Sequence, residues 1–379
     1  MFVFMGGPNG KNIERSVNNL VRRHGTPLFV VSKKLLIEQV EKFRALLPRV
    51  TPYYAVKANS HPDIIKTFVK LGMGFDVASR YEMELVLKHG AKPGRVVYAN
   101  PIKIPETMRY AMSQGIDLTV FDSEYELYKI AQHSPGARVL VRIKVPNIGS
   151  VVELSLKFGA EPTDAIPLLI KAHKLGLKPA GVAFHAGSQC THIENYIEAF
   201  EMTNIIMRDA RLKQIPISIV DIGGGMPIRH FDDDEDLFTK FAPSLSKEID
   251  RLFDDSVQVI AEPGRAMAGP ACTLITRVVG KSIRENKPWY YLDDGIYGAL
   301  SGILYDFCKY EYKVFKRGLT HISTIAGPTC DSHDIIARSV ELPILDINDV
   351  VYVENVGAYS IASTTWFNGI PPAKTIFVP

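Results

Sequence analysis

Apolar residues recur along this chain in two patterns, which alternate over most of its length. Short runs rich in Val, Ile, Tyr and Phe are followed by longer stretches in which apolar residues return every three or four positions. The first pattern is typical of buried strands and the second of amphipathic helices. Eight strands are predicted in this region, at residues 51–58, 73–78, 95–99, 117–121, 138–145, 180–185, 217–222 and 257–261.

Each gap between these strands has room for a helix. The helical pattern is clearest at residues 62–71, 80–89, 124–133, 162–175 and 193–211. Strands that alternate with helices form parallel sheets, and continuous apolar runs indicate strands that are covered on both faces. Eight repeats favour an α/β fold in which the strands close into a (β/α)8 barrel, or TIM barrel. A doubly wound open sheet is the alternative, because periodicity does not show closure.

The pattern changes after residue 265. Shorter runs rich in Val, Ile, Thr and Tyr, separated by turn residues, predict strands at 272–281, 289–293, 320–325 and 350–353. The start of the chain predicts a helix at 11–24 and a strand at 27–32, whose last residue, Ser32, can cap the next helix. We expect this first strand to join the later β region. The predicted domains are a barrel at 33–265 and a β domain made of 1–32 and 266–379.

Composition and charge exclude several classes of protein. The chain has 379 residues, of which 46% are hydrophobic and 22% charged, as in soluble globular proteins of two domains. A net charge of +3 predicts neither nucleic-acid nor membrane binding. No apolar run approaches about 18 residues, and the N-terminus does not resemble a signal peptide. The four cysteines are too scattered for a metal site or a disulfide framework, so reduced thiols in a cytoplasm are expected.

The first predicted barrel strand runs through apolar and aromatic residues into a lysine, Lys57. Burying an ammonium group is costly unless it is paired or neutralised. Apolar surroundings lower the pKa of a lysine, and a neutral amine can attack a carbonyl carbon. Lys57 is therefore a candidate Schiff-base lysine. The alternative is a lysine at a strand end whose ammonium reaches water.

The other predicted barrel strands also end in polar residues or glycines. In a (β/α)8 barrel these ends meet at one mouth, where active sites lie. The residues at these ends are, in chain order, Asp76, Ser79, Glu82, Asn100, Asp122, Arg142, His185, Gly187, Ser188, Asp221, Gly223, Gly224, Gly225, Glu262 and Arg265. Together with Lys57 they predict an active site at the mouth.

Three of these features have a specific chemical meaning. Three successive glycines at 223–225 let backbone N–H groups point at an anion, and with Arg265 they suggest a phosphate site. Glu262 could keep a proton on a ring nitrogen by placing negative charge beside it. His185, followed by small residues, could lie flat against a planar ring. With a Schiff-base lysine, these are the groups that pyridoxal phosphate requires of a protein.

Sequence motifs extend these features over nearly the whole chain. They are Tyr54-Ala-Val-Lys-Ala-Asn59, Phe75-Asp-Val-Ala-Ser79, Ala99-Asn-Pro101, Phe184-His-Ala-Gly-Ser188, Asp221-Ile-Gly-Gly-Gly225, Glu262-Pro-Gly-Arg265, Asp294-Gly-Ile-Tyr-Gly298, Tyr305-Asp306, Gly327-Pro-Thr-Cys-Asp331 and Glu354-Asn-Val-Gly-Ala-Tyr359. In combination they resemble the pyridoxal-phosphate-dependent decarboxylases of basic amino acids, which have an alanine-racemase-like fold. Within that family the chain is most similar to the ornithine decarboxylases.

The resemblance implies a fold, an assembly and a cofactor site. It implies a barrel that carries the cofactor, a C-terminal β-barrel-like domain completed by N-terminal residues, and a homodimer with two active sites at the interface. Lys57 would bind the cofactor covalently, His185 would stack on its ring and Glu262 would pair with its pyridine nitrogen. The other implied cofactor-binding residues are Asp76, Arg142, Ser188, Gly224, Gly225, Gly264, Arg265 and Tyr359. Four of them would hold the phosphate: Ser188, Gly225, Arg265 and Tyr359.

The resemblance also implies a substrate pocket shared between two subunits. Cys330 would be the proton donor and Asp331 would bind the substrate's distal amine, both from the partner subunit. Asp306 would approach the same amine from the chain that holds the cofactor. The pocket would be completed by Tyr297, Tyr305 and Phe367. The segments Phe307-Cys308-Lys309 and Ser332-His333 depart from the animal pattern, and they bear on the chain length of the substrate.

These implications predict a cytoplasmic enzyme of polyamine biosynthesis that converts L-ornithine to putrescine and carbon dioxide. Lysine is longer by one methylene, which a pocket discriminates by only about 1–3 kcal/mol, so a dual lysine/ornithine decarboxylase is the alternative. An arginine decarboxylase would need a differently shaped acidic fork. Diaminopimelate decarboxylase would need a cation for a distal carboxylate, and a racemase would lack the Cys330-Asp331 pair. A non-catalytic regulatory homologue would usually lack the lysine, the phosphate ligands or the cysteine, all of which are present.

Overall fold

The computed structural model describes residues 10–152 and 156–379, which fold into two compact units. The barrel unit comprises residues 39–228 and 236–267. The sheet unit comprises the described residues up to 38, residues 229–235 and residues 268–379. Among the described residues, no helix combines the length and the apolar character needed to cross a membrane.

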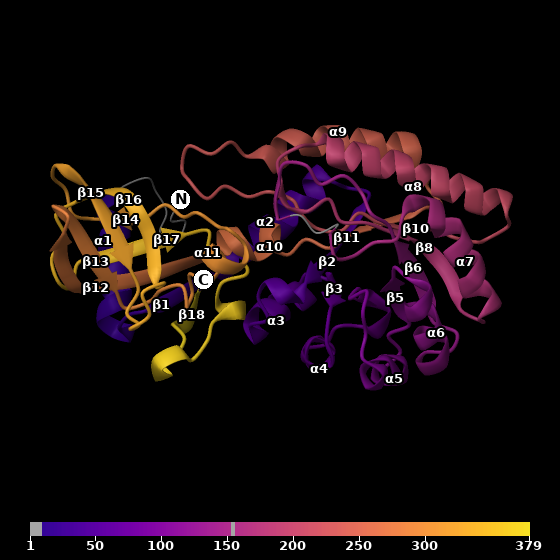
Figure 1. Ribbon diagram of the computed structural model, residues 1–379, viewed down its shortest axis with the longest axis horizontal. Helices are drawn as coiled ribbons and strands as arrows, with labels where there is room; N and C mark the ends of the chain where they lie inside the picture. The colour runs from indigo at the N-terminus through magenta and orange to yellow at the C-terminus, as the bar shows by residue number, and fades with distance from the viewer. Residues whose placement is uncertain (1–9, 153–155) are drawn as a thin grey trace. The chain divides into compact units, whose positions relative to one another are not determined.

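Eight parallel strands of the barrel unit close on themselves in the order β10-β11-β2-β3-β4-β5-β6-β8 (Figure 1). Their bounds are β2 Val50–Ala55, β3 Gly74–Val77, β4 Val96–Tyr98, β5 Leu118–Phe121, β6 Arg138–Arg142, β8 Lys178–Ala183, β10 Ile219–Asp221 and β11 Gln258–Ala261. All eight lie within or close to the predicted runs. The closure confirms the (β/α)8 barrel and excludes the open sheet.

The interior of the barrel is packed with side chains. The buried cluster there includes Tyr53, Val97, Leu118, Leu140 and Ile260. Tyr53 pairs in register with Gly74 on the next strand, and a Cβ atom at Gly74 would lie 2.5 Å from the Tyr53 ring. The glycine therefore makes room for the largest residue of this cluster, and the chemistry is left to the strand ends.

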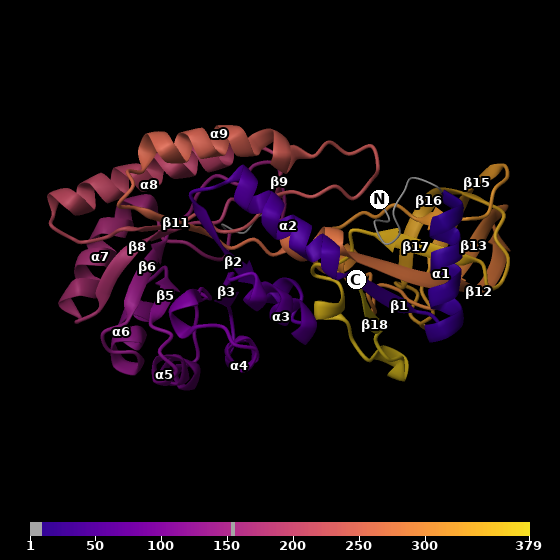
Figure 2. The same cartoon turned by 180° about the vertical axis from the view of Figure 1, so that it is seen from behind.

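Helices surround the barrel, and α8 and α9 run side by side (Figures 1 and 2). The helices are α2 Lys33–Leu46, α3 Pro62–Lys70, α4 Arg80–Lys88, α5 Pro105–Ser113, α6 Glu124–His133, α7 Ala165–Lys174, α8 Glu194–Leu212 and α9 Leu237–Leu252. Side-chain caps set several starts: Ser32 accepts from the backbone of Leu35, and Ser79 and Ser123 cap α4 and α6. α5 and α9 lie in gaps where no particular helix had been predicted.

The sheet unit is built on one sheet of eight strands. The strands are β1 Leu28–Ser32, β12 Cys272–Arg284, β13 Lys287–Leu292, β14 Lys313–Val314, β15 Thr320–Ala326, β16 Ile335–Pro343, β17 Val350–Glu354 and β18 Lys374–Val378. β1 pairs with β12 and β18, so the N-terminal strand joins the later β region, as predicted. Helix α1 (Gly10–His24) packs on this sheet through Val17, which contacts a cluster that includes Leu28 and Ile275.

Several shorter elements had no clear sequence signal. β7 (Ser150–Val152) and β9 (Ser188–Cys190) form a two-stranded antiparallel ribbon in the barrel unit. The short helices are α10 Arg265–Ala268, α11 Gly302–Tyr305, η1 Val56–Ala58, η2 Pro93–Arg95, η3 Pro162–Asp164, η4 Gly269–Ala271, η5 Ile361–Ser363 and η6 Phe367–Gly369. β14, β16 and β18 were also not predicted.

Candidate active site

Lys57 lies just beyond its strand. β2 ends at Ala55, and the chain turns into the one-turn helix η1, which carries the lysine. The side chain is 44% exposed. Its Nζ lies 2.6 Å from Oδ2 of Asp76, whose own side chain is almost fully buried. The ammonium group is therefore paired at the mouth of the barrel without being enclosed.

Three carboxyl groups and a guanidinium meet under this lysine. Asp221 and Arg142 are the last residues of β10 and β6. Asp76 is the last residue but one of β3, and Glu262 directly follows β11. Burial, followed by the charges of Asp221 and Asp76, raises the pKa of Glu262 well above its ordinary value. Burial likewise raises the pKa of Asp221 to about 7, and the carboxyl groups of Asp221 and Glu262 lie within hydrogen-bonding reach of each other. Both shifts favour protonation within this group of buried carboxyl groups.

Some of these buried polar atoms have no hydrogen-bond partner among the described residues. They are Asp76 Oδ1, Arg142 Nε and Glu262 Oε1. Burial also lowers the pKa of Arg142, against the opposing effect of the carboxylates around it. Buried polar atoms without partners are rare, because each costs the free energy of its lost hydration. A polar ligand with a hydrogen-bond donor for Glu262 would fit this mouth, as the ring nitrogen of pyridoxal phosphate would.

The glycines at 223–225 pass too close to neighbouring chain segments for any side chain. A Cβ atom at Gly224 would lie 2.7 Å from the carbonyl oxygen of Glu262, and one at Gly225 would lie 2.1 Å from that of Gly187. Gly225 also has a φ of +98°, which disfavours other residues. The carbonyl oxygen of Gly224 accepts a hydrogen bond of 2.7 Å from Tyr196. This loop is thus a bare backbone surface held at the mouth.

His185 sits beside this glycine loop. Its Nδ1 accepts a hydrogen bond of 3.0 Å from the backbone of Gly187, so the ring is neutral, with its hydrogen on Nε2. Burial, with the positive charges of Arg142 and Lys57, holds the pKa of His185 well below its usual value. A Cβ atom at Gly224 would lie 3.2 Å from Nε2, so the glycine leaves that edge of the ring uncovered. A neutral imidazole suits stacking on an aromatic ring.

The remaining predicted cofactor residues of the barrel unit lie on the same loops. Ser188 begins β9, Gly264 precedes α10, and Arg265 is its first residue and is buried. The backbone N–H of Ala55 donates to the carbonyl oxygen of Pro263 at 3.3 Å. This bond connects the loop that carries Arg265 to the strand that leads to Lys57.

Two residues at the mouth were missed or not fully interpreted from the sequence. Tyr196, on α8, is buried and holds the glycine loop, but it lies 29 residues before Gly225 and outside every motif. The sequence places Glu82 just beyond a strand end and predicts no role for it. Its carboxylate accepts a hydrogen bond of 2.6 Å from the backbone of Ala78, and burial raises its pKa to about 7. Both side chains position backbone next to the predicted cofactor residues.

The sheet unit brings together three of the predicted substrate residues. The Tyr297 hydroxyl donates to Oδ2 of Asp331, and the Tyr297 ring stacks on Phe367 with centroids 4.4 Å apart. Oδ1 of Asp331 accepts from the backbone N–H and ring Nδ1 of His333, at 2.9 and 3.1 Å. Cys330, next in sequence, is exposed, and its backbone N–H donates to Asn368 at 3.1 Å. A carboxylate and a thiol thus project from one loop.

The other three predicted residues of this unit lie on two further loops. Asp306 follows α11 and is buried, and its Oδ2 accepts from the thiol of Cys308 at 3.5 Å. Tyr305, the last residue of α11, is exposed. Tyr359 adopts a φ of +53° in the loop after β17.

A buried carboxylate that no sequence argument singled out organises these loops. Asp334 is almost fully buried and accepts hydrogen bonds from the backbone of Ile296 and from both the backbone and the hydroxyl of Thr329, at 3.1, 3.1 and 2.7 Å. A Cβ atom at Gly295 or Gly327 would lie 2.3 or 2.2 Å from its carboxylate. The glycines of two motifs therefore make room for Asp334, which joins the loop of Tyr297 to that of Asp331.

Comparison with known proteins identifies the family. The model of the pyridoxal-binding domain of pyridoxal-dependent decarboxylases matches residues 33–269. The chain belongs to this family. It is 39% identical to the lysine/ornithine decarboxylase of Selenomonas ruminantium, over 96% of this chain and 92% of that protein. It is 37% identical to the ornithine decarboxylase of Schizosaccharomyces pombe, over 97% and 87%.

A solved structure agrees with the fold. The protein named SrLDC, in complex with PLP and cadaverine, superimposes with a TM-score of 0.91 at 38% identity, covering 96% of this chain and 93% of that one. This decarboxylase is therefore pyridoxal-phosphate-dependent. The unpartnered Glu262 oxygen and the neutral His185 at the barrel mouth fit that cofactor.

Proposed function

We propose that this decarboxylase converts L-ornithine to putrescine and carbon dioxide, as a cytoplasmic enzyme of polyamine biosynthesis. The observation that carries the substrate class is the Asp331 carboxylate, held in place by Tyr297 and His333 beside the exposed thiol of Cys330. Such a carboxylate suits the distal ammonium group of a diamino acid, because a buried cation needs a negative partner. The names of the relatives support a basic amino acid as substrate.

In this proposal the domain 33–265 binds the cofactor. Bound pyridoxal phosphate supplies an electron-withdrawing ring that stabilises the negative charge left on Cα when carbon dioxide departs. Lys57 holds the cofactor covalently, and Asp76 orients its amine. Glu262 keeps a proton on the ring nitrogen. His185 covers one face of the ring.

The phosphate end and the substrate end complete the proposed roles. Backbone N–H groups at Gly224 and Gly225, with Gly264, Ser188, Arg265 and Arg142, provide donors and positive charge at the barrel mouth, and Tyr359 adds a hydroxyl. Cys330 donates the proton that Cα receives. Asp331 and Asp306 bind the distal ammonium, while Tyr297, Tyr305 and Phe367 shape the pocket around the methylene chain. In a homodimer the β domain, 1–32 and 266–379, would contribute to the interface: Cys330 and Asp331 would serve the active site of the second subunit, and Asp306 that of its own chain.

A dual lysine/ornithine decarboxylase is the second candidate, favoured by the name of the relative from Selenomonas ruminantium. The two substrates differ by one methylene, so a loosely packed pocket would accept both. Arginine and meso-diaminopimelate fit less well, because one presents a wider guanidinium and the other a second carboxylate to Asp331.

Steady-state release of carbon dioxide from L-ornithine, L-lysine, L-arginine and meso-diaminopimelate, with saturating pyridoxal phosphate, tests the proposal. Ornithine should give the highest kcat/KM, and a lysine value within tenfold of it would identify the dual enzyme. A higher value for arginine or diaminopimelate would contradict the assignment. Release from none of the four by a cofactor-loaded protein would point instead to a non-catalytic binding protein.

A further inference from the structure

His333 makes two contacts with the carboxylate proposed to bind substrate. Its backbone N–H and its ring Nδ1 both reach Oδ1 of Asp331, at 2.9 and 3.1 Å. Because an ionised carboxylate only accepts hydrogen bonds, Nδ1 must carry a hydrogen in the neutral ring as well as in the charged ring. The His333 side chain is 86% exposed, so Nε2 can exchange a proton with solvent. The ring can therefore gain or lose a charge without losing its bond to Asp331.

The groups around this pair keep their own charges fixed near neutral pH. The hydrogen bond to Asp331, then burial, raises the pKa of Tyr297 to about 12. Bonds from His333 and Tyr297 lower the pKa of Asp331 to about 2. Asp334, behind the loop, already accepts hydrogen bonds from Ile296 and Thr329. Histidine is the residue type in this group that ordinarily titrates between pH 5 and 8.

Little acceptor capacity remains on Asp331. A carboxylate has about four lone-pair positions. The Tyr297 hydroxyl, the His333 backbone and the His333 ring occupy three of them. A substrate ammonium would take the remaining position, within a few ångströms of the imidazole. Any positive charge on His333 would thus act directly on that ammonium.

We propose that His333 is a specificity-determining residue whose protonation sets how strongly Asp331 binds the distal ammonium of the substrate. This inference rests on the proposed function. A neutral His333 leaves the charge of Asp331 to the substrate. A protonated His333 neutralises that charge and repels the ammonium. The effect reaches only ligands with a cationic distal end, so discrimination between diamino and monoamino acids weakens as the pH falls.

The test compares ornithine with norvaline, which has the same carbon chain without the distal amine. KM for ornithine and the inhibition constant of norvaline are measured from pH 6 to pH 8 on the holoenzyme and on its His333→Gln variant. In the wild type the ratio of ornithine KM to norvaline Ki should rise at least about threefold from pH 8 to pH 6, as expected for two like charges about 5 Å apart in a solvated site. In His333→Gln the ratio should stay constant, since glutamine donates a hydrogen bond without titrating.

A constant ratio in the wild type overturns the inference, and this measurement needs no variant. An equal rise in His333→Gln also overturns it, because another group would then carry the pH dependence. Failure of the proposed function looks different: the cofactor-loaded wild type would not decarboxylate ornithine at any pH.

Discussion

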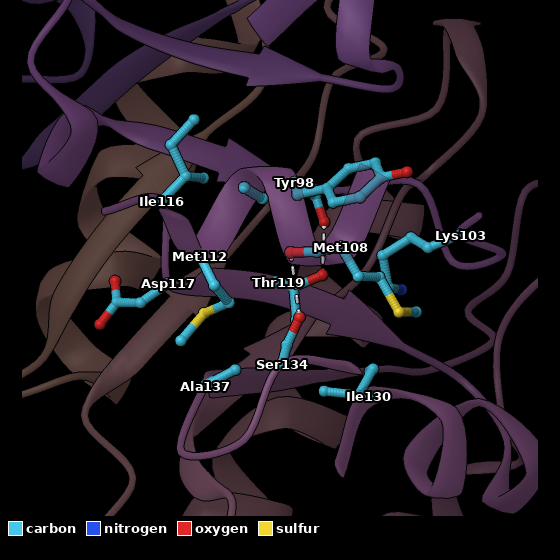
Figure 3. A pocket seen from close by; sticks show the side chains of 11 residues that line it. Tyr98, Lys103, Met108, Met112, Ile116, Asp117, Thr119, Ile130, Ser134 and Ala137 are labelled. Atoms are coloured by element: carbon cyan, nitrogen blue, oxygen red, sulfur yellow. Dashed lines mark hydrogen bonds between the residues drawn. The ribbon is translucent and has the colours of Figure 1, made fainter. Parts of the chain in front are cut away.

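Lys103 provides the sharpest test of how this barrel is stabilised. Its side chain is fully buried, and its Nζ donates to the carbonyl oxygens of Asn100, Pro101 and Val120 at 3.0, 3.2 and 2.5 Å. It also lies 3.1 Å from the carboxylate of Glu126. The lysine thus joins the loop after β4 to β5 and to α6. It lines a narrow cavity in the barrel wall, shown in Figure 3 with Tyr98, Thr119 and Ser134.

Replacing Lys103 by methionine keeps most of the volume and removes the charge and all four contacts. Glu126 is 2% exposed, so its carboxylate would remain buried with fewer partners, and three carbonyl groups would lose their donor. Removing one partner of a buried ion pair costs about 3–5 kcal/mol. Lys129 offers a matched control: it pairs with the same carboxylate at 2.7 Å, but its side chain is 29% exposed. Lys129→Met should cost about 1 kcal/mol or less.

Urea unfolding followed by two probes measures this difference. Circular dichroism at 222 nm follows mainly the barrel helices, whereas both tryptophans, Trp289 and Trp366, lie in the sheet unit and report on it by fluorescence. With a slope of about 3 kcal/mol/M, Lys103→Met should lower the circular-dichroism midpoint by about 1 M or more. Equal midpoints for Lys103→Met and Lys129→Met would refute the reasoning, because the buried and the partly exposed lysine would then contribute alike.

The pH dependence of the unfolding free energy provides a second test of the role of Lys103. Burial lowers the pKa of Lys103 to about 8, below the usual 10.5. Between these values the unfolded chain binds more protons than the folded one, so this residue makes stability rise with pH across that window. The wild type should therefore gain stability relative to Lys103→Met between pH 8 and pH 10. If the difference in unfolding free energy between the wild type and Lys103→Met narrows over that range, the lysine is not held in the folded state as the contacts indicate.

Three further predictions concern the chemistry. Glu262→Gln should slow decarboxylation by orders of magnitude while the circular-dichroism spectrum is unchanged, because an amide cannot stabilise a protonated ring nitrogen as a carboxylate does; a wild-type kcat would exclude that role. Asp331→Asn and Asp306→Asn should each raise KM for ornithine about tenfold or more, through loss of a charged hydrogen bond, and an unchanged KM in both would place the distal amine elsewhere. Lys57→Ala and Cys330→Ala, dissociated, mixed and reassociated, should recover about a quarter of wild-type activity if each site takes one residue from each subunit. Half of the randomly paired dimers are mixed, and each has one intact site. No recovery despite subunit exchange confirmed by mass would mean that the site is built within one chain.

The fold was predictable where a residue's surroundings are set by its own segment. Strands covered on both faces have mostly apolar sequences, and such runs lie at or close to all eight strands of the barrel. Apolar runs do not predict a strand that forms only because a neighbouring strand pairs with it. β16 carries three polar, exposed residues, Arg338, Ser339 and Glu341, and is a strand because β15 pairs with it. β18 is partly exposed along most of its length and is held by β1, more than 300 residues earlier. No local pattern can encode such a partner.

The same distinction, between what a residue's own segment determines and what distant contacts determine, applies to the candidate site. The sequence predicts Lys57, Glu262 and His185 as candidates because polar groups directly after buried strands are unusual, and because the family's motifs contain them. Their supports were not found, since a support is defined by what it touches. In the sequence Tyr196 resembles any buried aromatic residue of a helix. Only the structure shows that its hydroxyl donates to the carbonyl oxygen of Gly224. The sequence does not distinguish Asp334 from the other aspartates. Its role is visible only in the structure, where two glycines leave space for its carboxylate. The glycines of the motifs were the available signal. Each of them marks a place where the side chain of another residue must fit. Contacts in three dimensions are needed to identify that residue.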